Sequence, residues 1–449
     1  MTFHDCLLTP GNVFSRNNLW QSWLDVEAAM ALSQAEIGMI PQWAADEIAS
    51  KAKLENLDAL ALEASVAETM APIVSLVRML SSICGEAGGF VHWGGTTQNI
   101  MSTGRLLLVR HAHRAISAHI AGALDLLGDL AATHAGTIMA GRTNNRHALP
   151  ITFGFKVAGW IEELARQNAR FAEAEERVFA LYFGGAIGAM HSFGPAGDEL
   201  SVALARRLDL TSVLVPSRAS LDSQAEYVTC LGLFAMAVGR IASDLFRHMT
   251  EEIGEVSERH GPEVIGSSTM PHKVNPKNVV HLIAVAAQLR AKVASALEAG
   301  LPSYEGDAAS NQLMANTLET ACALAWELAQ RLETTLAGLD IETEQMVRNL
   351  SLSASHIASE RLMMVLATRI GRTQAHDLVH DAVARSLAGE GTVQDLLLDR
   401  PDVARSMSAA EVAEALAPGN YLGSAPDIAR RAAEMAHAVA SDLRNRMAQ

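Results

Sequence analysis

The residues best suited to chemistry lie in the segment 266–276, which reads Gly-Ser-Ser-Thr-Met-Pro-His-Lys-Val-Asn-Pro. Two serines follow the glycine, and two prolines restrict the backbone on either side of Lys273 and Asn275. A helical pattern starts directly after the second proline, so the first backbone N–H groups of that helix face the segment. These N–H groups, an ammonium and an amide can together bind a carboxylate. The alternative is a turn that caps a helix and leaves Lys273 in solvent.

The elements that must position this segment are predicted to be long α-helices. Apolar residues recur with helical spacing, and alternating strand-like runs are nearly absent. The predicted helices span residues 105–133, 154–179, 222–256, 277–299 and 311–337, with shorter ones at 342–350, 354–370, 373–388 and 425–447. Helices of this length and apolarity bury more than one face, so we expect an all-α fold in which several chains associate.

Three helical domains are predicted along the chain. Residues 1–100 form an N-terminal helical domain, residues 101–345 a central long-helix bundle, and residues 346–449 a C-terminal helical domain. The segment 256–276 connects two long helices of the central bundle and contains several Gly and Pro residues. Long connections of this kind in compact chains are usually functional.

Composition excludes several classes of protein. With 49% hydrophobic residues, the 449-residue chain is too apolar for intrinsic disorder. Lys and Arg number 35 against 50 Asp and Glu, and the resulting net charge of −15 disfavours nucleic-acid binding. The four cysteines are far apart in the sequence, which indicates small buried side chains rather than a disulfide framework or zinc cluster. The N-terminus lacks a signal-peptide pattern and charges interrupt the apolar runs, so we expect a cytoplasmic protein without a membrane span.

The segment 266–276 resembles the signature of the fumarase/aspartase superfamily, Gly-Ser-Ser-x-Met-Pro-x-Lys-x-Asn-Pro, at every fixed position. Residues 91–98 are similar to the first block of that family, and residues 141–152 are similar to the second. The segments 183–186, 254–256 and 421–423 look most like the branch of 3-carboxy-cis,cis-muconate cycloisomerase and adenylosuccinate lyase. The resemblance implies a homotetramer with a twenty-helix core, in which each active site combines blocks from three subunits. It implies no metal or organic cofactor.

By this resemblance, the reaction is a β-elimination from a succinyl compound, and the segment 266–276 supplies its base. Ser267 is the expected general base, which reacts as an alkoxide and removes a proton next to a carboxylate. The product of this step is a dianionic aci-carboxylate, which needs preorganised donors. Lys273 and Asn275 are expected to bind the substrate carboxylate, while Ser268 has a structural role.

The first block supplies further candidates for substrate binding. Thr96, Thr97 and Gln98 match positions that hydrogen-bond substrate carboxylates in the family, and hydroxyl and amide groups suit that task. The alternative for either threonine is helix N-capping. His92 matches a position implicated in substrate binding in the adenylosuccinate branch, and its alternative is a packed, hydrogen-bonded histidine.

The second block departs from the family pattern of Thr-His-x-Gln. Thr143 is present, but Asn144 replaces the histidine that assists proton transfer to the leaving group, as in the cycloisomerase branch, which also lacks it. Arg146 replaces the glutamine and can bind an additional anionic group, or it lies solvated or salt-bridged at the surface. We expect these three residues to bind substrate. His147, displaced by three residues, is the candidate proton donor.

These residues predict a lyase that acts on a small dicarboxylate or tricarboxylate. The expected reaction breaks a C–N or C–O bond, eliminates an amine or similar group from a substituted succinate, and yields fumarate. Differences at 220–222 and 304–308, where relatives contact the leaving group, argue against adenylosuccinate or carboxymuconate as the default substrate. Two alternatives stay open: a lactonising cycloisomerase of the 3-carboxy-cis,cis-muconate type, and a catalytically silent structural homologue.

Overall fold

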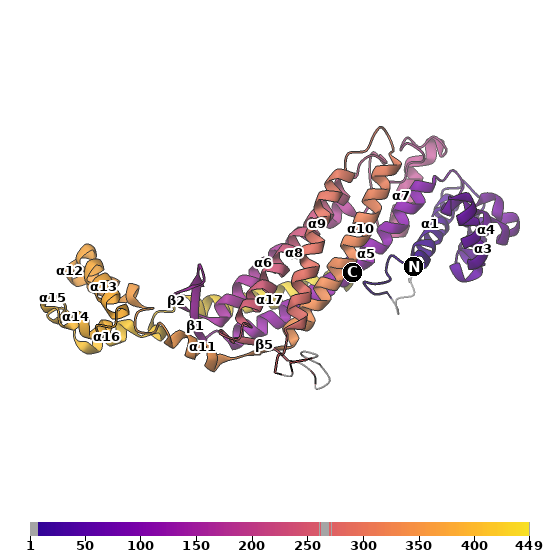
Figure 1. The fold of residues 1–449 in the computed structure, drawn as a ribbon. Helices are drawn as coiled ribbons and strands as arrows, with labels where there is room; N and C mark the ends of the chain where they lie inside the picture. Colours follow the sequence, from indigo (N-terminus) through magenta and orange to yellow (C-terminus); the bar gives the residue numbers. More distant parts are fainter. Residues whose placement is uncertain (1–7, 260, 262–268, 271, 449) are drawn as a thin grey trace. The chain divides into compact units, whose positions relative to one another are not determined.

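The computed structural model describes residues 8–259, 261, 269–270 and 272–448, and most of them are helical (Figure 1). The long helices are α5 (Thr97–Thr133), α6 (Phe153–Val178), α8 (Asp222–His248), α9 (Lys277–Ala299) and α10 (Ala308–Ala337). The N-terminal helices are α1 (Arg16–Glu36), α2 (Gln42–Lys51), α3 (Ala59–Thr69) and α4 (Pro72–Ile83), and α7 (Gly197–Leu208) precedes α8. The later helices are α11 (Thr343–Ser351), α12 (Ser359–Ile370), α13 (Arg372–Leu387), α14 (Val393–Leu398), α15 (Pro401–Ala404), α16 (Ala409–Leu416) and α17 (Ala425–Ala448). The prediction of an all-α fold is confirmed.

Several helix boundaries differ from the prediction for local reasons. Helix α9 begins directly after Pro276 and ends at Ala299, both as predicted. Helix α8 ends at His248 rather than at residue 256, because residues 249–253 form turns, and Gly254, whose φ is +56°, leads into a strand. Helix α5 begins at Thr97 rather than at residue 105, because the helix continues through Gly104. Gly104 lies at a close approach to α1, where an added Cβ atom would be 2.7 Å from Trp23.

Six short strands accompany the helices in the described chain. Strands β1 (Ile138–Thr143) and β2 (Arg146–Thr152) form an antiparallel hairpin, and Thr143 pairs with Arg146 at its end. Strands β3 (Ala180–Leu181) and β4 (Thr211–Ser212) are parallel, while β5 (Val256–Glu258) and β6 (Leu339–Ile341) are antiparallel. Strands are thus few and short, and residues 138–152 form a hairpin that the sequence pattern does not predict.

The chain divides into two compact units. Unit 1 comprises residues up to 119, 166–239 and 282–331, and unit 2 comprises residues 120–165, 240–281 and 332 onwards. Each of the five long helices contributes residues to both units. The division into three domains at residues 100 and 345 stays a prediction.

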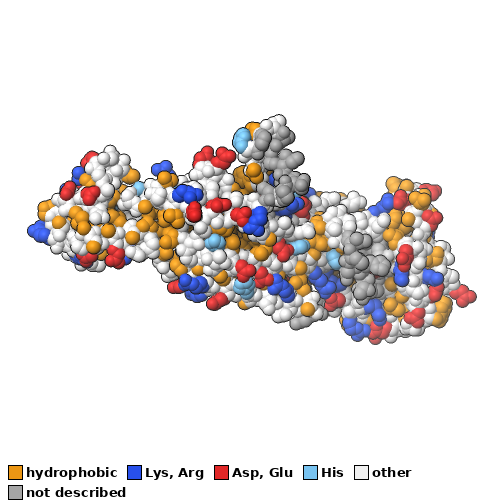
Figure 2. All heavy atoms as spheres, turned by 90° about the horizontal axis from the view of Figure 1, so that it is seen from below, with side chains coloured by type: hydrophobic (Ala, Val, Ile, Leu, Met, Phe, Trp, Pro, Cys, Tyr) orange, Lys and Arg blue, Asp and Glu red, His pale blue; other side chains and the backbone are white. Residues whose placement is uncertain are grey.

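Apolar side chains are exposed at many places on the face drawn in Figure 2, among charged ones. Helices α5, α8 and α9 are long and apolar enough to cross a membrane by length and composition, and their most apolar windows are 50%, 67% and 33% buried within the chain. On α8 and α9, the exposed apolar residues are Met236, Phe246, Val280 and Leu297. Much of the apolar surface of α9 is therefore not covered by its own chain.

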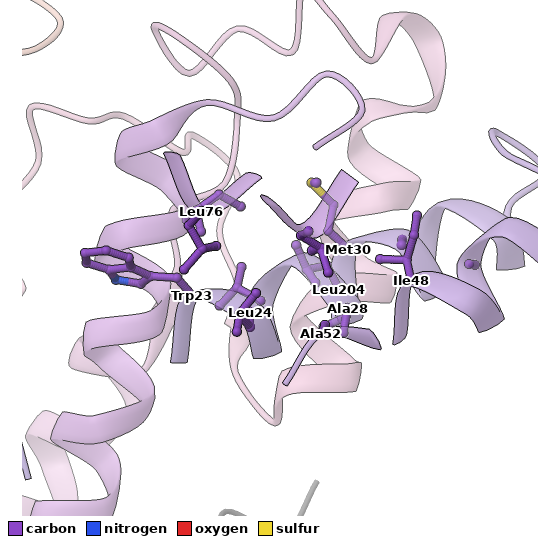
Figure 3. Packing of buried hydrophobic residues seen from close by; sticks show 14 of the residues in the cluster. Trp23, Leu24, Ala28, Met30, Ile48, Ala52, Leu76 and Leu204 are labelled. Atoms are coloured by element: carbon purple, nitrogen blue, oxygen red, sulfur yellow. The ribbon is translucent and has the colours of Figure 1, made fainter. Parts of the chain in front are cut away.

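The core of unit 1 holds the start of α5 in place. Trp23 and Leu24 of α1 pack with Leu76 of α4, and Ile48 of α2 and Leu204 of α7 belong to the same buried cluster (Figure 3). Each of these side chains is at most 5% exposed. Burial of side chains of this size contributes about 1.5–3 kcal/mol each. Ile100 and Leu107 of α5 belong to the same cluster, so this packing holds the start of the helix that carries the first block.

Three of the four cysteines are small buried side chains without a disulfide, as predicted. Cys84, Cys230 and Cys322 are buried and free. Burial raises the pKa of the Cys84 thiol to about 11, so the thiol is protonated and unreactive at neutral pH. Cys6 lies outside the described residues.

Candidate functional site

The first block lies at the N-terminus of α5 in unit 1. Thr97 is the first residue of the helix and is exposed, and Thr96 precedes it. The backbone N–H groups of Asn99 and Ile100 donate to the carbonyl oxygen of Thr96. Within the described part of the chain, neither threonine hydroxyl makes a hydrogen bond, so the capping alternative is not realised there. Both hydroxyls are available to a ligand.

His92 precedes this helix in a left-handed backbone conformation, with φ at +59°. Its Nδ1 lies 2.6 Å from Oε1 of Glu27, whose side chain is fully buried in α1. Burial of the ring lowers the pKa of His92, but the hydrogen bond and the charge of Glu27 outweigh this effect and raise it above 6.5. His92 is thus hydrogen-bonded through one nitrogen, as expected for the alternative of a packed, hydrogen-bonded histidine. Its Nε2 has no partner among the described residues and can donate to an anion.

The second block forms the tip of the β1–β2 hairpin in unit 2. Asn144 and Asn145 have φ values of +49° and +59°, which matches a two-residue type I′ turn. Asparagine tolerates this left-handed conformation better than almost any other residue with a Cβ atom. The asparagine at position 144 therefore has a conformational reason. Thr143 and Arg146 flank the turn, both exposed, and Arg146 makes no ion pair within the described chain.

His147 follows the turn on β2 and is half-buried. Its Nδ1 lies 2.7 Å from the hydroxyl oxygen of Ser353. Burial lowers the pKa of His147 below 6.5, and the positive charge of Arg142 lowers it further. Glu255 has a smaller opposite effect, and His356 and Arg146 add still smaller lowering effects. The ring is therefore mainly neutral at pH 7. Its imidazolium is a stronger acid than usual but is populated only at lower pH.

A buried carboxylate holds the base of the hairpin. Glu255, which is fully buried, accepts two hydrogen bonds from Arg142, at 2.9 and 2.7 Å. It also accepts one from Nδ2 of Asn349 at 2.8 Å, and Nδ1 of His248 lies 2.7 Å from its Oε2. Burial alone would raise the pKa of Glu255, but these bonds to His248, Arg142 and Asn349 lower it to about 2. The hairpin is thus anchored by a charge pair that joins residues 113 positions apart.

A cavity of about 530 Å³ opens beside this network, entirely within unit 2. Asn144 and His147 of the second block line it, as do the cations Arg142, Lys156 and Arg247. The other lining residues are Ala140, Asn145, Asp244, His248, Thr250, Glu252, Ile253, Asn349 and Leu352. Two of these cations already have a carboxylate partner, since Arg142 is paired with Glu255 and Lys156 with Asp244 at 3.1 Å.

The third block precedes α9, also in unit 2. Ser267 and Ser268 lie outside the described residues. Lys273 is exposed, and its backbone N–H group donates to the carbonyl oxygen of Met270. Asn275 is half-buried. The helix begins where the sequence predicts, but two of its first N–H groups are occupied: those of residues 278 and 279 donate to the carboxylate of Glu258 at 3.0 and 2.7 Å. The expectation that these N–H groups bind a ligand is wrong for those two positions.

The predicted site residues thus fall into two groups. His92, Thr96, Thr97 and Gln98 lie in unit 1, whereas the hairpin residues, Lys273 and Asn275 lie in unit 2. The structure adds residues that sequence reasoning did not assign a role. Glu255 lies in the segment 254–256, whose resemblance to the family marks this glutamate but does not indicate what it does. Among the described residues, no group of three or more His, Cys, Asp or Glu side chains can hold a metal ion.

Comparison with families of known proteins gives two matches. Residues 11–290 match the family described as Lyase. Residues 356–432 match the family described as Adenylosuccinate lyase C-terminus. The two matches do not overlap and together include all three blocks.

Individual relatives match over nearly the whole chain. N-acetyl-S-(2-succino)cysteine lyase of Enterococcus italicus is 34% identical over 405 residues, which are 90% of this chain and 89% of that protein. The crystal structure of 3-carboxy-cis,cis-muconate lactonizing enzyme from Pseudomonas putida has a TM-score of 0.88 and 31% identity, covering 96% of this chain and 97% of that chain. The crystal structure of a fumarate lyase from Mesorhizobium sp. BNC1 has a TM-score of 0.88 and 32% identity, with 95% and 97% covered.

Proposed function

The chain belongs to the fumarase/aspartase superfamily of lyases, and from this premise we propose that it eliminates a leaving group from a substituted succinate to give fumarate. The observation that carries the proposal is the complete signature segment at 266–276, in a chain whose relatives match it nearly end to end. Ser267 is the general base, which removes the proton next to a carboxylate. The electrons of that C–H bond form the aci-carboxylate and then expel the leaving group.

The aci-carboxylate carries an extra negative charge that the site must stabilise. Lys273 and Asn275 supply an ammonium and an amide for this purpose. The N–H groups of residues 278 and 279 already donate to Glu258. The side chains of Lys273 and Asn275 therefore stabilise the extra charge more than the helix terminus does. The exposed position of Lys273 in the single chain fits a residue that meets its ligand between subunits.

The first block binds the substrate carboxylate at the start of α5. The hydroxyls of Thr96 and Thr97 are unoccupied within the described chain, and Gln98 adds an amide. His92 supports this role because Glu27 keeps its ring cationic over a wider pH range and leaves Nε2 directed to other partners. An imidazolium N–H forms a charge-assisted hydrogen bond with a carboxylate.

The active protein is a homotetramer in the cytoplasm, with each site shared between subunits. One observation supports the assembly. The most apolar window of α9 is only 33% buried within its own chain, although such a surface is normally covered. Light scattering on the purified protein is expected to give a tetramer, and a monomer at working concentration would contradict this arrangement.

The leaving group departs with a proton that the second block helps to supply. Asn144 cannot donate one at neutral pH, so His147 is the proposed proton donor and Arg146 contacts an anionic part of the substrate. The proposed substrates are therefore N-, O- or S-substituted succinates. The S-substituted class enters because one relative is named for N-acetyl-S-(2-succino)cysteine.

A second candidate function is a lactonising cycloisomerase. It is favoured by the absence of a histidine at position 144 and by the similarity to the muconate lactonizing enzyme. In that reaction a carboxylate adds within the same molecule, and no separate leaving group is expelled.

An absorbance assay separates these functions. The purified protein is mixed with aspartate, N-substituted aspartates, argininosuccinate, adenylosuccinate, malate, nitrosuccinate and N-acetyl-S-(2-succino)cysteine, and the appearance of fumarate is followed in the ultraviolet. Consumption of 3-carboxy-cis,cis-muconate is followed in parallel. Fumarate from a succinyl compound supports the lyase and identifies the leaving group. Consumption of the muconate alone supports the cycloisomerase, and no reaction across the set favours the catalytically silent homologue.

The base is tested by two neighbouring substitutions. Ser267→Ala is expected to lower kcat about a thousandfold, because the alkoxide has no replacement. Ser268→Ala is the matched control and is expected to retain most of the turnover. Equal activity of the Ser267→Ala and wild-type proteins would remove the base assignment.

A further inference from the structure

A guanidinium without a carboxylate partner lies in unit 1, in the connection that precedes α8. Arg218 is half-buried, and its Nη1 donates to the carbonyl oxygen of Ala186. Its Nε is fully buried and has no hydrogen-bond partner. No carboxylate of the described chain forms an ion pair with it. Partly buried cations are normally paired, because the loss of hydration is otherwise not compensated.

The same side chain lines a small polar cavity of about 40 Å³. The cavity is lined by Gln98, Asn99, Ser102, Thr103, Leu106, Ala180, Tyr182, Ser217, Arg218, Ser220, Leu221, Gln224 and Asn311. Arg218 is the cation of this wall, and none of these lining residues is acidic. The volume accommodates about three water molecules, which is close to the size of one carboxylate group. The polar lining residues offer hydroxyl and amide donors.

Fixed contacts build the wall of this cavity. Asn99 is buried, its Nδ2 donates to the carbonyl oxygen of Tyr182 at 3.2 Å, and its Oδ1 accepts from the N–H group of Gly185 at 2.9 Å. These bonds hold the turn that presents Ala186 to Arg218. The guanidinium is therefore held by a bond to the backbone of this turn. A donor held in place before binding loses little conformational entropy on binding.

The cavity adjoins the first block, because Gln98 belongs to both. In the proposed function, the two carboxylates of the succinyl unit are bound by the first block and by Lys273 with Asn275. Arg218 is a cation outside both groups. A further carboxylate on the substrate would supply the missing counter-charge.

We propose that the cavity lined by Arg218 and Gln98 is a carboxylate subsite, and that it selects tricarboxylate substrates whose leaving group carries the third carboxylate. The assignment of that carboxylate to the leaving group rests on the proposed function. Arg218 is accordingly a specificity-determining residue, which binds by a fork of N–H donors and takes no part in proton transfer.

Calorimetric titration of the full chain tests the subsite without any turnover. The probes are propane-1,2,3-tricarboxylate, which has three carboxylates, and succinate, which has two. Arg218→Gln is expected to weaken binding of the tricarboxylate about 10- to 100-fold, as for the loss of a charged hydrogen bond, and to leave the succinate Kd unchanged. Arg240→Gln is the matched control, because it removes an arginine that is paired with Glu163 at the surface.

A second variant guards against a folding defect. Gln224→Glu places a carboxylate in the same wall while the bond from Arg218 to Ala186 stays intact. It is expected to weaken tricarboxylate binding about tenfold by charge repulsion, with succinate again unaffected. If neither variant alters tricarboxylate binding, or if both probes weaken equally, the tricarboxylate subsite is refuted. If the subsite behaves as expected but no succinyl compound yields fumarate, the proposed function fails and the subsite stands.

Discussion

Replacement of Glu255 by glutamine tests whether one buried carboxylate anchors the β1–β2 hairpin. Glutamine has nearly the same shape but no charge. In the wild-type protein, the Glu255 carboxylate accepts both bonds of the Arg142 fork and a bond from Asn349, and it lies 2.7 Å from Nδ1 of His248. After the substitution, Arg142 keeps its position, with a side chain only 19% exposed, but has no counter-charge at this site.

The size of the effect follows from the pKa of Glu255. Its fall from 4.5 to about 2 corresponds to about 3 kcal/mol of stability, at 1.36 kcal/mol for each pKa unit. Removal of one partner from a buried ion pair costs a similar amount, about 3–5 kcal/mol. Because the folded pKa lies below the unfolded one, this contribution is complete above about pH 4.5 and is lost as the pH falls towards 2.

Hydrogen exchange of the hairpin amides, residues 138–152, reads the effect locally, and urea unfolding at constant protein concentration reads it globally. At pH 7, we expect Glu255→Gln to lower the free energy of opening of the hairpin by about 3 kcal/mol. Glu226→Gln is the control, because Glu226 makes an equally close two-bond pair with Arg177 at the surface. That substitution is expected to cost at most about 1 kcal/mol.

The acid range provides the refutation. In the wild-type protein, the hairpin is expected to lose protection as the pH falls from 4.5 towards 2, and in Glu255→Gln this loss is absent because there is no carboxylate to protonate. If the variant and the wild type lose protection in parallel, Glu255 is not the anchor. Equal stabilities of Glu255→Gln and Glu226→Gln at pH 7 would lead to the same conclusion.

Substitutions of Gly104, Asn144 and His92 test the elements around the site, with Gly159→Ala and Asn144→Gly as controls. Gly104→Ala places a Cβ atom 2.7 Å from Trp23 and should lower the free energy of unfolding in urea by about 1–3 kcal/mol. Gly159→Ala has open space around it and should raise that free energy by up to about 1 kcal/mol. Similar values for both would contradict the close approach of α1 and α5. Asn144→Val should lower stability by about 1–2 kcal/mol because of its positive φ, whereas Asn144→Gly should be tolerated, as read by the thermal midpoint; equal midpoints would exclude strain at the turn. His92→Gln should lose stability relative to wild type below pH 6.5, and the difference should shrink as the pH rises through the raised pKa of His92; a constant difference would show that the pairing with Glu27 does not raise that pKa.

The helices were predictable because their signals are local. Helix α9 runs over the predicted residues, since Pro276 and the apolar periodicity that follows it both act within a few positions. The end of α8 was misplaced by eight positions, because apolar residues continue to 256 while residues 249–253 have already turned the chain. The β1–β2 hairpin was not predicted, because its turn consists of two asparagines rather than Asn-Gly and its strands do not alternate cleanly.

The sequence by itself determined the family, the long helices and the residues of the reactive segment, because motif and periodicity are properties of neighbouring residues. Only the tertiary structure decided how charges far apart in the chain pair with one another. Arg142 and Glu255 are 113 positions apart in the sequence, and their ion pair holds the base of the β1–β2 hairpin that carries the second block. Arg218 and Gln98 likewise line one cavity although no local pattern joins them. Burial and charge depend on which helices pack together, and this packing is the sum of many weak contacts that no single segment contains.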